Sequence, residues 1–234
     1  RMDRDRASFE RSLASLREAF GRGVVPIQLP IGSEKGFRGV VDLITMQALV
    51  YKPDGDGKPS IESIPADLAD AATAAHEELV EMVAEGDDAL MQEFFDEGTL
   101  PVDDLRKGIR AAVIEKRIFP VMLASALHNI GADAILDFVV SAFPSPDLRG
   151  EVVGSTAVAD GEQLSRRIAD SDPLSLFVYK TLADPFAGRI TYFKVMSGVL
   201  KNDATLQNYT RNSSERLQHI QVMQGKTATA VPDL

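Results

Sequence analysis

Apolar residues recur at helical spacing along the first part of the chain. Between residues 5 and 20 they stand three or four positions apart, which predicts a helix with one buried face: Phe9, Leu13, Leu16 and Phe20. The same spacing runs through residues 66–85 and predicts a longer amphipathic helix. Two shorter helices are expected, one after Asp87 and one after Pro101. The second start is expected because proline suits the first position of a helix.

Short apolar runs between these helices predict strands, at Val24–Leu29 and Val121–Ala124. The turn-rich segment Pro53–Pro59 predicts a hairpin tip. Residues 147–172 are rich in Gly, Asp and Ser without a helical period, and we expect a linker or an extended connection there. From Leu174 onward the hydrophobic period changes to two, which predicts a small antiparallel β-barrel.

The strand at Val121–Ala124 leads into a short turn. The turn reads Ser125-Ala126-Leu127, and after Gly131 a helix carries Ile135, Leu136, Val139 and Val140 on one face. A tight turn of this kind leaves backbone N–H groups free after the strand, and its small side chains let a planar ring approach closely. Because such triplets also occur by chance, the turn is informative only together with Met2-Asp3-Arg4 at the other end of the same domain and with the sequence around both.

The first residues, Arg1-Met2-Asp3-Arg4, resemble the end of the Asn-Lys-x-Asp motif with which GTPases bind guanine. In this interpretation the Asp3 carboxylate accepts hydrogen bonds from guanine N1 and the exocyclic amino group, each contributing about 1.5–3 kcal/mol. Adenine would leave this acceptor unpaired. Arg1 stands where the motif has Lys, and the motif's Asn lies outside the sequence. The alternative is that Asp3 caps the helix that runs from Ala7 to Phe20.

Longer segments are similar to the elongation factor G family, and more closely to its bacterial elongation-factor-G-like paralogues. They follow the family's order along nearly the whole chain: Val25–Gly32, Phe37–Ile44, His76–Glu81, Ala84–Asp88, Phe143–Pro146 and Ala183–Ile190. Gln224-Gly225-Lys226-Thr227, followed by Val231-Pro232, favours the paralogue over the main factor.

The resemblance implies an α/β and β chain: the late half of a P-loop-type G domain with an inserted α+β subdomain, followed by a small antiparallel β-barrel. Residues 1–146 would belong to the G domain, with the insertion at about 27–115, and residues 147–172 would form the linker. Residues 173–234 would form the barrel, similar to domain II of translation factors and either complete or truncated. The resemblance also implies that the chain is an internal fragment of a longer GTPase. The guanine of GTP would then be bound by Asp3, Ser125, Ala126 and Leu127.

The phosphate-binding loop of such GTPases, Gly-x-x-x-x-Gly-Lys-Ser/Thr, does not occur in the sequence. Gly225-Lys226-Thr227 resembles its end, but Ile220 stands where the motif needs its first Gly. We therefore expect the chain alone to be inactive, with no catalytic residue and no bound cofactor. The full-length parent is expected to bind GTP or GDP with Mg²⁺. No metal site is expected at His76, because Val80 replaces the second His of a zinc-binding helix.

The net charge and the composition limit the classes of partner that the protein is expected to bind. The net charge of −10 argues against a protein that coats nucleic acid, and no DNA partner is expected. The absence of cysteine fits a reducing cytoplasm, and no apolar run approaches the roughly 18–20 residues that span a bilayer, so we expect a cytoplasmic protein without a membrane partner. The resemblance makes Arg189 and Lys194 candidates for contact with ribosomal RNA. From the sequence alone, ordinary solvated charges are the simpler interpretation.

The function implied by the resemblance is that of a ribosome-associated translational GTPase, which couples GTP hydrolysis to tRNA–mRNA translocation and has ribosomal RNA and proteins as partners. Two alternatives stay open. One is a ribosome-protection or release-factor-like GTPase with the same core, and the other is a non-catalytic module that binds the ribosome or a protein.

Overall fold

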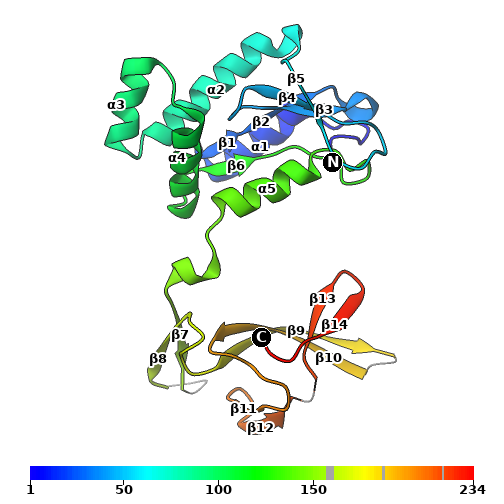
Figure 1. Cartoon of the computed structure of the whole chain (residues 1–234), viewed down its shortest axis with the longest axis vertical. Coiled ribbons are helices and arrows are strands. Elements are labelled where there is room, and N and C mark those ends of the chain that lie inside the picture. The colour runs from blue at the N-terminus through cyan, green and yellow to red at the C-terminus, as the bar shows by residue number, and fades with distance from the viewer. Residues whose placement is uncertain (157–160, 186–187, 218) are drawn as a thin grey trace. The chain divides into compact units, whose positions relative to one another are not determined.

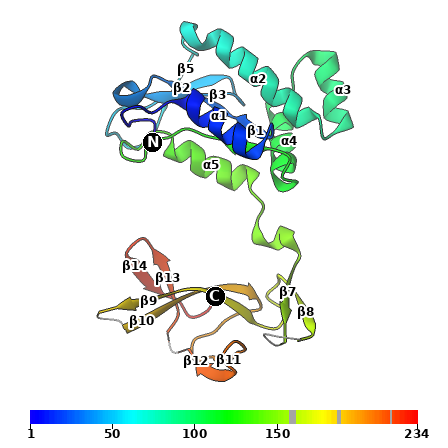
Figure 2. The same cartoon turned by 180° about the vertical axis from the view of Figure 1, so that it is seen from behind.

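A computed structural model describes residues 1–156, 161–185, 188–217 and 219–234 of the chain. The chain divides into two compact units, Arg1–Pro144 and Ser145–Leu234. Figures 1 and 2 show the units from opposite sides, with the helices of the first unit and the hairpins of the second labelled. No helix among the described residues is long and apolar enough to cross a membrane.

The first unit contains a parallel strand pair and a separate antiparallel sheet. β1 (Val24–Pro26) pairs in parallel with β6 (Phe119–Val121). The antiparallel sheet has the order β2-β3-β4-β5, with strands Gln28–Ile31, Gly39–Asp42, Gln47–Val50 and Ser60–Glu62. Only Ile27 separates β1 from β2, so the chain leaves the parallel pair and enters the sheet at once. The family resemblance implied that the insertion starts at about residue 27.

All α-helices of the described residues lie in the first unit: α1 (Phe9–Phe20), α2 (Ala69–Ala84), α3 (Asp88–Glu97), α4 (Val102–Ile114) and α5 (Ala132–Ala142). Short 3₁₀ turns occupy Glu34–Gly36, Ala66–Leu68 and Pro146–Arg149. Local signals set the helix starts. The Ser8 hydroxyl accepts a hydrogen bond from the Arg11 N–H, and the Asp87 carboxylate accepts from the first turn of α3. The helices predicted from sequence periodicity are therefore present.

The core of the first unit lies where the inserted helices meet. Leu79 and Val83 of α2 and Leu105 and Ile109 of α4 are buried, and burying a side chain of this size stabilises the fold by about 1.5–3 kcal/mol. Gly108 lies at the contact between these helices. A Cβ atom at position 108 would come within 2.4 Å of Val83 Cγ1, so the close approach of α4 to α2 requires glycine.

Helix α5 leaves the apolar face seen in the sequence in contact with solvent. Leu136, Val139 and Val140 are 66%, 44% and 82% exposed, whereas Phe138 and Ala142 are buried. Outside the polar stripe of Asp133, Asp137 and Ser141 the helix carries only apolar residues, so its sequence does not determine which apolar side packs inward.

The second unit is built of antiparallel hairpins, which confirms the predicted antiparallel β domain. Its described strands form four two-stranded pairs: β7 (Glu151–Ser155) with β8 (Gln163–Arg167), β9 (Ser175–Asp184) with β10 (Gly188–Ser197), β11 (Thr205–Asn208) with β12 (Ser213–Arg216), and β13 (Gln221–Gln224) with β14 (Thr227–Ala230).

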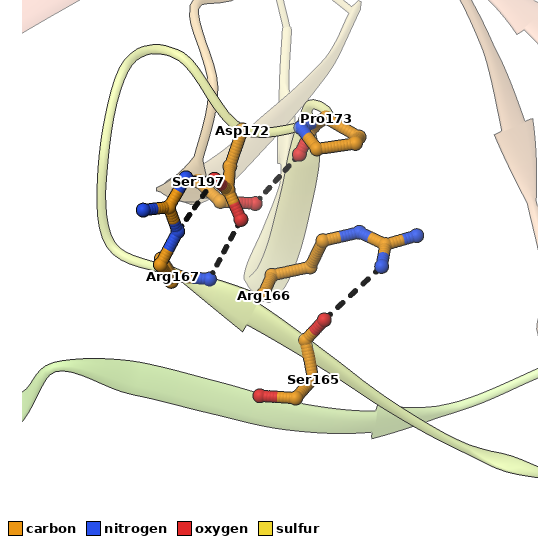
Figure 3. A network of polar contacts seen from close by, with 6 residues as sticks. All are labelled: Ser165, Arg166, Arg167, Asp172, Pro173 and Ser197. Carbon is orange, nitrogen blue, oxygen red and sulfur yellow. Dashed lines mark hydrogen bonds and ion pairs between the residues drawn. The ribbon is translucent and has the colours of Figure 1, made fainter.

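The segment 147–172, expected as a linker, contains the β7–β8 hairpin. Its strands carry mostly polar side chains, so apolar alternation did not mark them. Asp172 holds the end of this hairpin (Figure 3): its carboxylate accepts hydrogen bonds from the Arg167 backbone N–H at 2.9 Å and from the Arg167 guanidinium at 2.9 and 3.1 Å. The N–H bond is the main reason why the pKa of Asp172 lies below its usual value. Next to it, the Ser197 hydroxyl donates to the Pro173 carbonyl at 2.7 Å. This segment is thus a piece of the second unit.

Candidate guanine-binding site

The structure brings Asp3 and Ser125 together, although 122 positions of sequence separate them. The backbone N–H of Met2 donates to the Ala124 carbonyl at 3.2 Å, which fixes the start of the chain beside the end of the β6 segment. The Asp3 side chain is only 8% exposed. A hydrogen bond from the Ser125 hydroxyl is the largest cause of the lowered pKa of Asp3, so the carboxylate is ionised at neutral pH.

Asp3 does not cap α1. The cap is Ser8, whose hydroxyl accepts from the Arg11 N–H at 3.2 Å. The alternative interpretation of Asp3 as a helix cap is therefore wrong.

The residues after β6 form a closed turn, which we call the base turn (residues 125–131). Ser125 and Ile130 exchange two backbone hydrogen bonds, at 2.9 and 3.0 Å, and both residues are buried. The Ser125 hydroxyl also accepts from the His128 N–H at 3.4 Å. Gly131 ends the turn with φ +74°, and a Cβ there would lie 2.6 Å from the Leu123 carbonyl oxygen. Glycine is thus required where the turn passes into α5.

Ala126 and Leu127 form the exposed tip of the base turn. Both residues are exposed, Leu127 by 68%. Their backbone N–H groups donate no hydrogen bond to any described residue. The base turn therefore combines a buried serine, an adjacent carboxylate and two available backbone donors. This set can accept hydrogen bonds through Asp3 and donate them through the tip, as recognition of one edge of guanine requires.

One buried contact behind this site was missed in the sequence. The Gln28 side chain, in β2, is 2% exposed, and its Oε1 atom accepts a hydrogen bond from the Leu123 N–H at 3.0 Å. Leu123 lies two residues before Ser125, so Gln28 links the first strand of the antiparallel sheet to the approach of the base turn. A lone Gln between apolar residues was the available signal, because a buried amide needs a polar partner.

The candidate RNA-contacting residues, Arg189 and Lys194, lie on β10 in the second unit, and both are exposed. They are five positions apart in one strand, and the pairing of β9 with β10 shifts register between them, at Tyr192 and Phe193. Residues 186 and 187, which belong to the segment Ala183–Ile190 that resembles the family, lie outside the described residues. That Arg189 and Lys194 contact RNA stays a prediction.

Two comparisons with known proteins show what the chain is similar to. Residues 173–234 match the family model of elongation factor G domain 2. The chain is also similar to the crystal structure of ttk003000868 from Thermus thermophilus, with a TM-score of 0.73 and 27% sequence identity over 97% of this chain. The match covers 31% of the Thermus chain, so this chain spans about a third of that protein's length. The domain match in the second unit and the fold match along the chain together support an elongation factor G family fragment.

Proposed function

We propose that this chain is the guanine-recognising and ribosome-facing part of a translational GTPase resembling the elongation-factor-G-like paralogues. The activity would be GTP hydrolysis coupled to tRNA–mRNA translocation on the ribosome. The observation that carries the proposal is the meeting of Asp3 and Ser125 beside the free N–H groups of Ala126 and Leu127.

The chemistry of this arrangement favours guanine over other bases. An ionised Asp3 accepts from guanine N1–H and from the exocyclic amino group, while a backbone N–H at the tip of the base turn donates to O6. Adenine carries an amino group in place of O6 and no hydrogen on N1. Its amino group would therefore face the N–H donors of the base turn, and the Asp3 carboxylate would lose its partner at N1. A site of this kind rejects the wrong base strongly, because its own polar groups lose their partners.

The phosphates of GTP and its Mg²⁺ would be bound by groups that this sequence does not contain, since it has no Gly-x-x-x-x-Gly-Lys-Ser/Thr loop. Much of the affinity for a nucleotide comes from such a loop and the helix N-terminus after it. The isolated chain should therefore bind GDP weakly, and the nucleotide experiments below use the natural protein at its full length.

Asp3→Asn tests the proposal through a change of base preference. Xanthine carries an oxygen where guanine has its amino group, so an Asn amide can donate to it, whereas an Asp carboxylate repels it. We expect the affinity for GDP to fall at least tenfold, since each bond to the carboxylate contributes roughly 10- to 150-fold. The affinity for xanthosine diphosphate should rise.

Asp5→Asn is the matched control, because Asp5 is an exposed carboxylate two positions away. Calorimetric titration of both variants with both nucleotides gives the four affinities needed. If Asp3→Asn kept the wild-type affinity for GDP and gained none for xanthosine diphosphate, the chain would not recognise guanine through Asp3. The non-catalytic ribosome- or protein-binding module would then be the better description.

A further inference from the structure

The loop that joins β4 to β5 lies against the base turn. We call residues 51–58 the insertion loop, because they belong to the inserted subdomain. Figures 1 and 2 both show the connection between β4 and β5 beside the turn that precedes α5. Three contacts join the insertion loop to the base turn or to the start of α5, and each is made by residues more than 70 positions apart.

The first contact fixes the end of the base turn. Tyr51 is 3% exposed, and its hydroxyl donates to the Asp133 carboxylate at 2.7 Å. Asp133 lies in the first turn of α5, two residues after Gly131. Burial, and then the hydrogen bond to Asp133, raise the pKa of Tyr51, so the hydroxyl keeps its proton and the bond persists throughout the neutral range.

The second and third contacts reach the base turn itself. The Asp54 carboxylate lies 3.0 Å from His128 Nδ1. Gly57 has φ +80° and packs directly on Asn129, since a Cβ at position 57 would come within 2.4 Å of Asn129 Nδ2. Asp54 and Asn129 both have positive φ values, of 53° and 51°, which Asp and Asn tolerate better than most residues. The backbone conformations of the insertion loop and of the base turn thus allow the two segments to pack against each other.

His128 connects the insertion loop to the serine of the candidate site. Its ring contacts Asp54 of the insertion loop, and its backbone N–H donates to the Ser125 hydroxyl. A hydrogen bond from Ser125 is in turn the largest cause of the lowered pKa of Asp3. A shift of the insertion loop would move His128, and with it the Ser125 hydroxyl that bonds to Asp3.

We propose that the insertion loop positions the base turn for guanine, with Tyr51 and Asp54 as positioning residues. This inference rests on the proposed function, and it assigns a share of base recognition to the inserted subdomain. The tip of the base turn is exposed, and ordering an exposed turn upon binding costs conformational entropy. Contacts that hold the turn in its binding shape before the nucleotide arrives remove that cost and strengthen binding.

The test measures dissociation of a fluorescent GDP from the natural protein at full length. Tyr51→Phe and Asp54→Ala should each speed dissociation about 2- to 12-fold, the range that one intramolecular hydrogen bond supports. Two controls should change nothing. Tyr209→Phe lies at an exposed tyrosine of the second unit, and Asp56→Asn lies in the same loop, where the Asp56 carboxylate accepts from the Lys58 N–H.

A second nucleotide separates positioning from general loss of stability. The diphosphate of 2-aminopurine riboside lacks O6, so it cannot use the donors at the tip of the base turn. Tyr51→Phe and Asp54→Ala should therefore alter its dissociation less than that of GDP. Equal changes for both nucleotides, or no change for GDP, would overturn the positioning role. If the wild-type protein itself failed to prefer GDP over ADP, the proposed function would fail as well, independently of the variants.

Discussion

Replacing Gln28 with Leu removes a buried side chain that joins β2 to the residue two positions before Ser125. Gln28 Oε1 accepts the Leu123 N–H at 3.0 Å, and the two residues are 2% and 6% exposed. Leu has a similar volume, so the substitution opens no large cavity. It does leave a buried backbone donor without a partner, which costs about 1–3 kcal/mol.

That cost should appear as a loss of stability in the first unit. A unit of this size shifts its Tm by roughly 4 °C for each kcal/mol, so Gln28→Leu should lower the Tm by about 4–12 °C. Far-ultraviolet circular dichroism reports this unit selectively, because all α-helices of the described residues belong to it. The control is Gln47→Leu, at an exposed position of β4. Equal stability of the two variants in urea and heat would refute the argument that the Gln28–Leu123 bond is needed.

Two further predictions concern the second unit. Charge reversal of Arg189 and Lys194 in the full-length natural protein should weaken ribosome binding and flatten its salt dependence, because each phosphate contact that is removed lowers the log–log slope by up to about 0.7–0.9. The same change at Lys107 and Arg110 of the first unit should do less, and equal losses of binding in a pelleting assay would reject the assignment to β10. Asp172→Ala should expose the β7–β8 hairpin to limited proteolysis, because the Arg167 N–H loses its acceptor. Asp170→Ala is the control in the same turn, and equal cleavage rates would contradict a structural role for Asp172.

Helices with strong local signals could be predicted from the sequence. Asp87 and Pro101 stand at the starts of α3 and α4, and the buried Leu105 and Ile109 of α4 lie four positions apart, at helical spacing. These features depend on residues within one or two turns of each other. Local chemistry was sufficient there because the helix start and its apolar face lie in the same short stretch.

Predictions were weaker where packing between distant segments decides which face of a helix is buried or whether a hairpin forms. Helix α5 buries Phe138 and exposes Val140, a choice made by its neighbours and not by its own sequence, which is apolar outside one polar stripe. The β7–β8 hairpin is held by backbone pairing and by the bonds of Asp172 to Arg167, neither of which leaves an apolar alternation in the sequence. Its residues therefore resembled a linker.

The candidate site shows the same difference between features set by local sequence and features set by contacts between distant segments. Asp3 and Ser125 could be named together only through resemblance to a family, because no local pattern connects residues so far apart. The contacts that hold the base turn, from Gln28 to Leu123 and from Asp54 to His128, span 95 and 74 positions, and no sequence period marks them. Both Gln28 and Asp54 lie between Asp3 and Ser125 in the chain, within the inserted stretch. The insertion thus contributes directly to the shape of the turn, and its removal should affect guanine recognition even though none of its residues is proposed to touch the base.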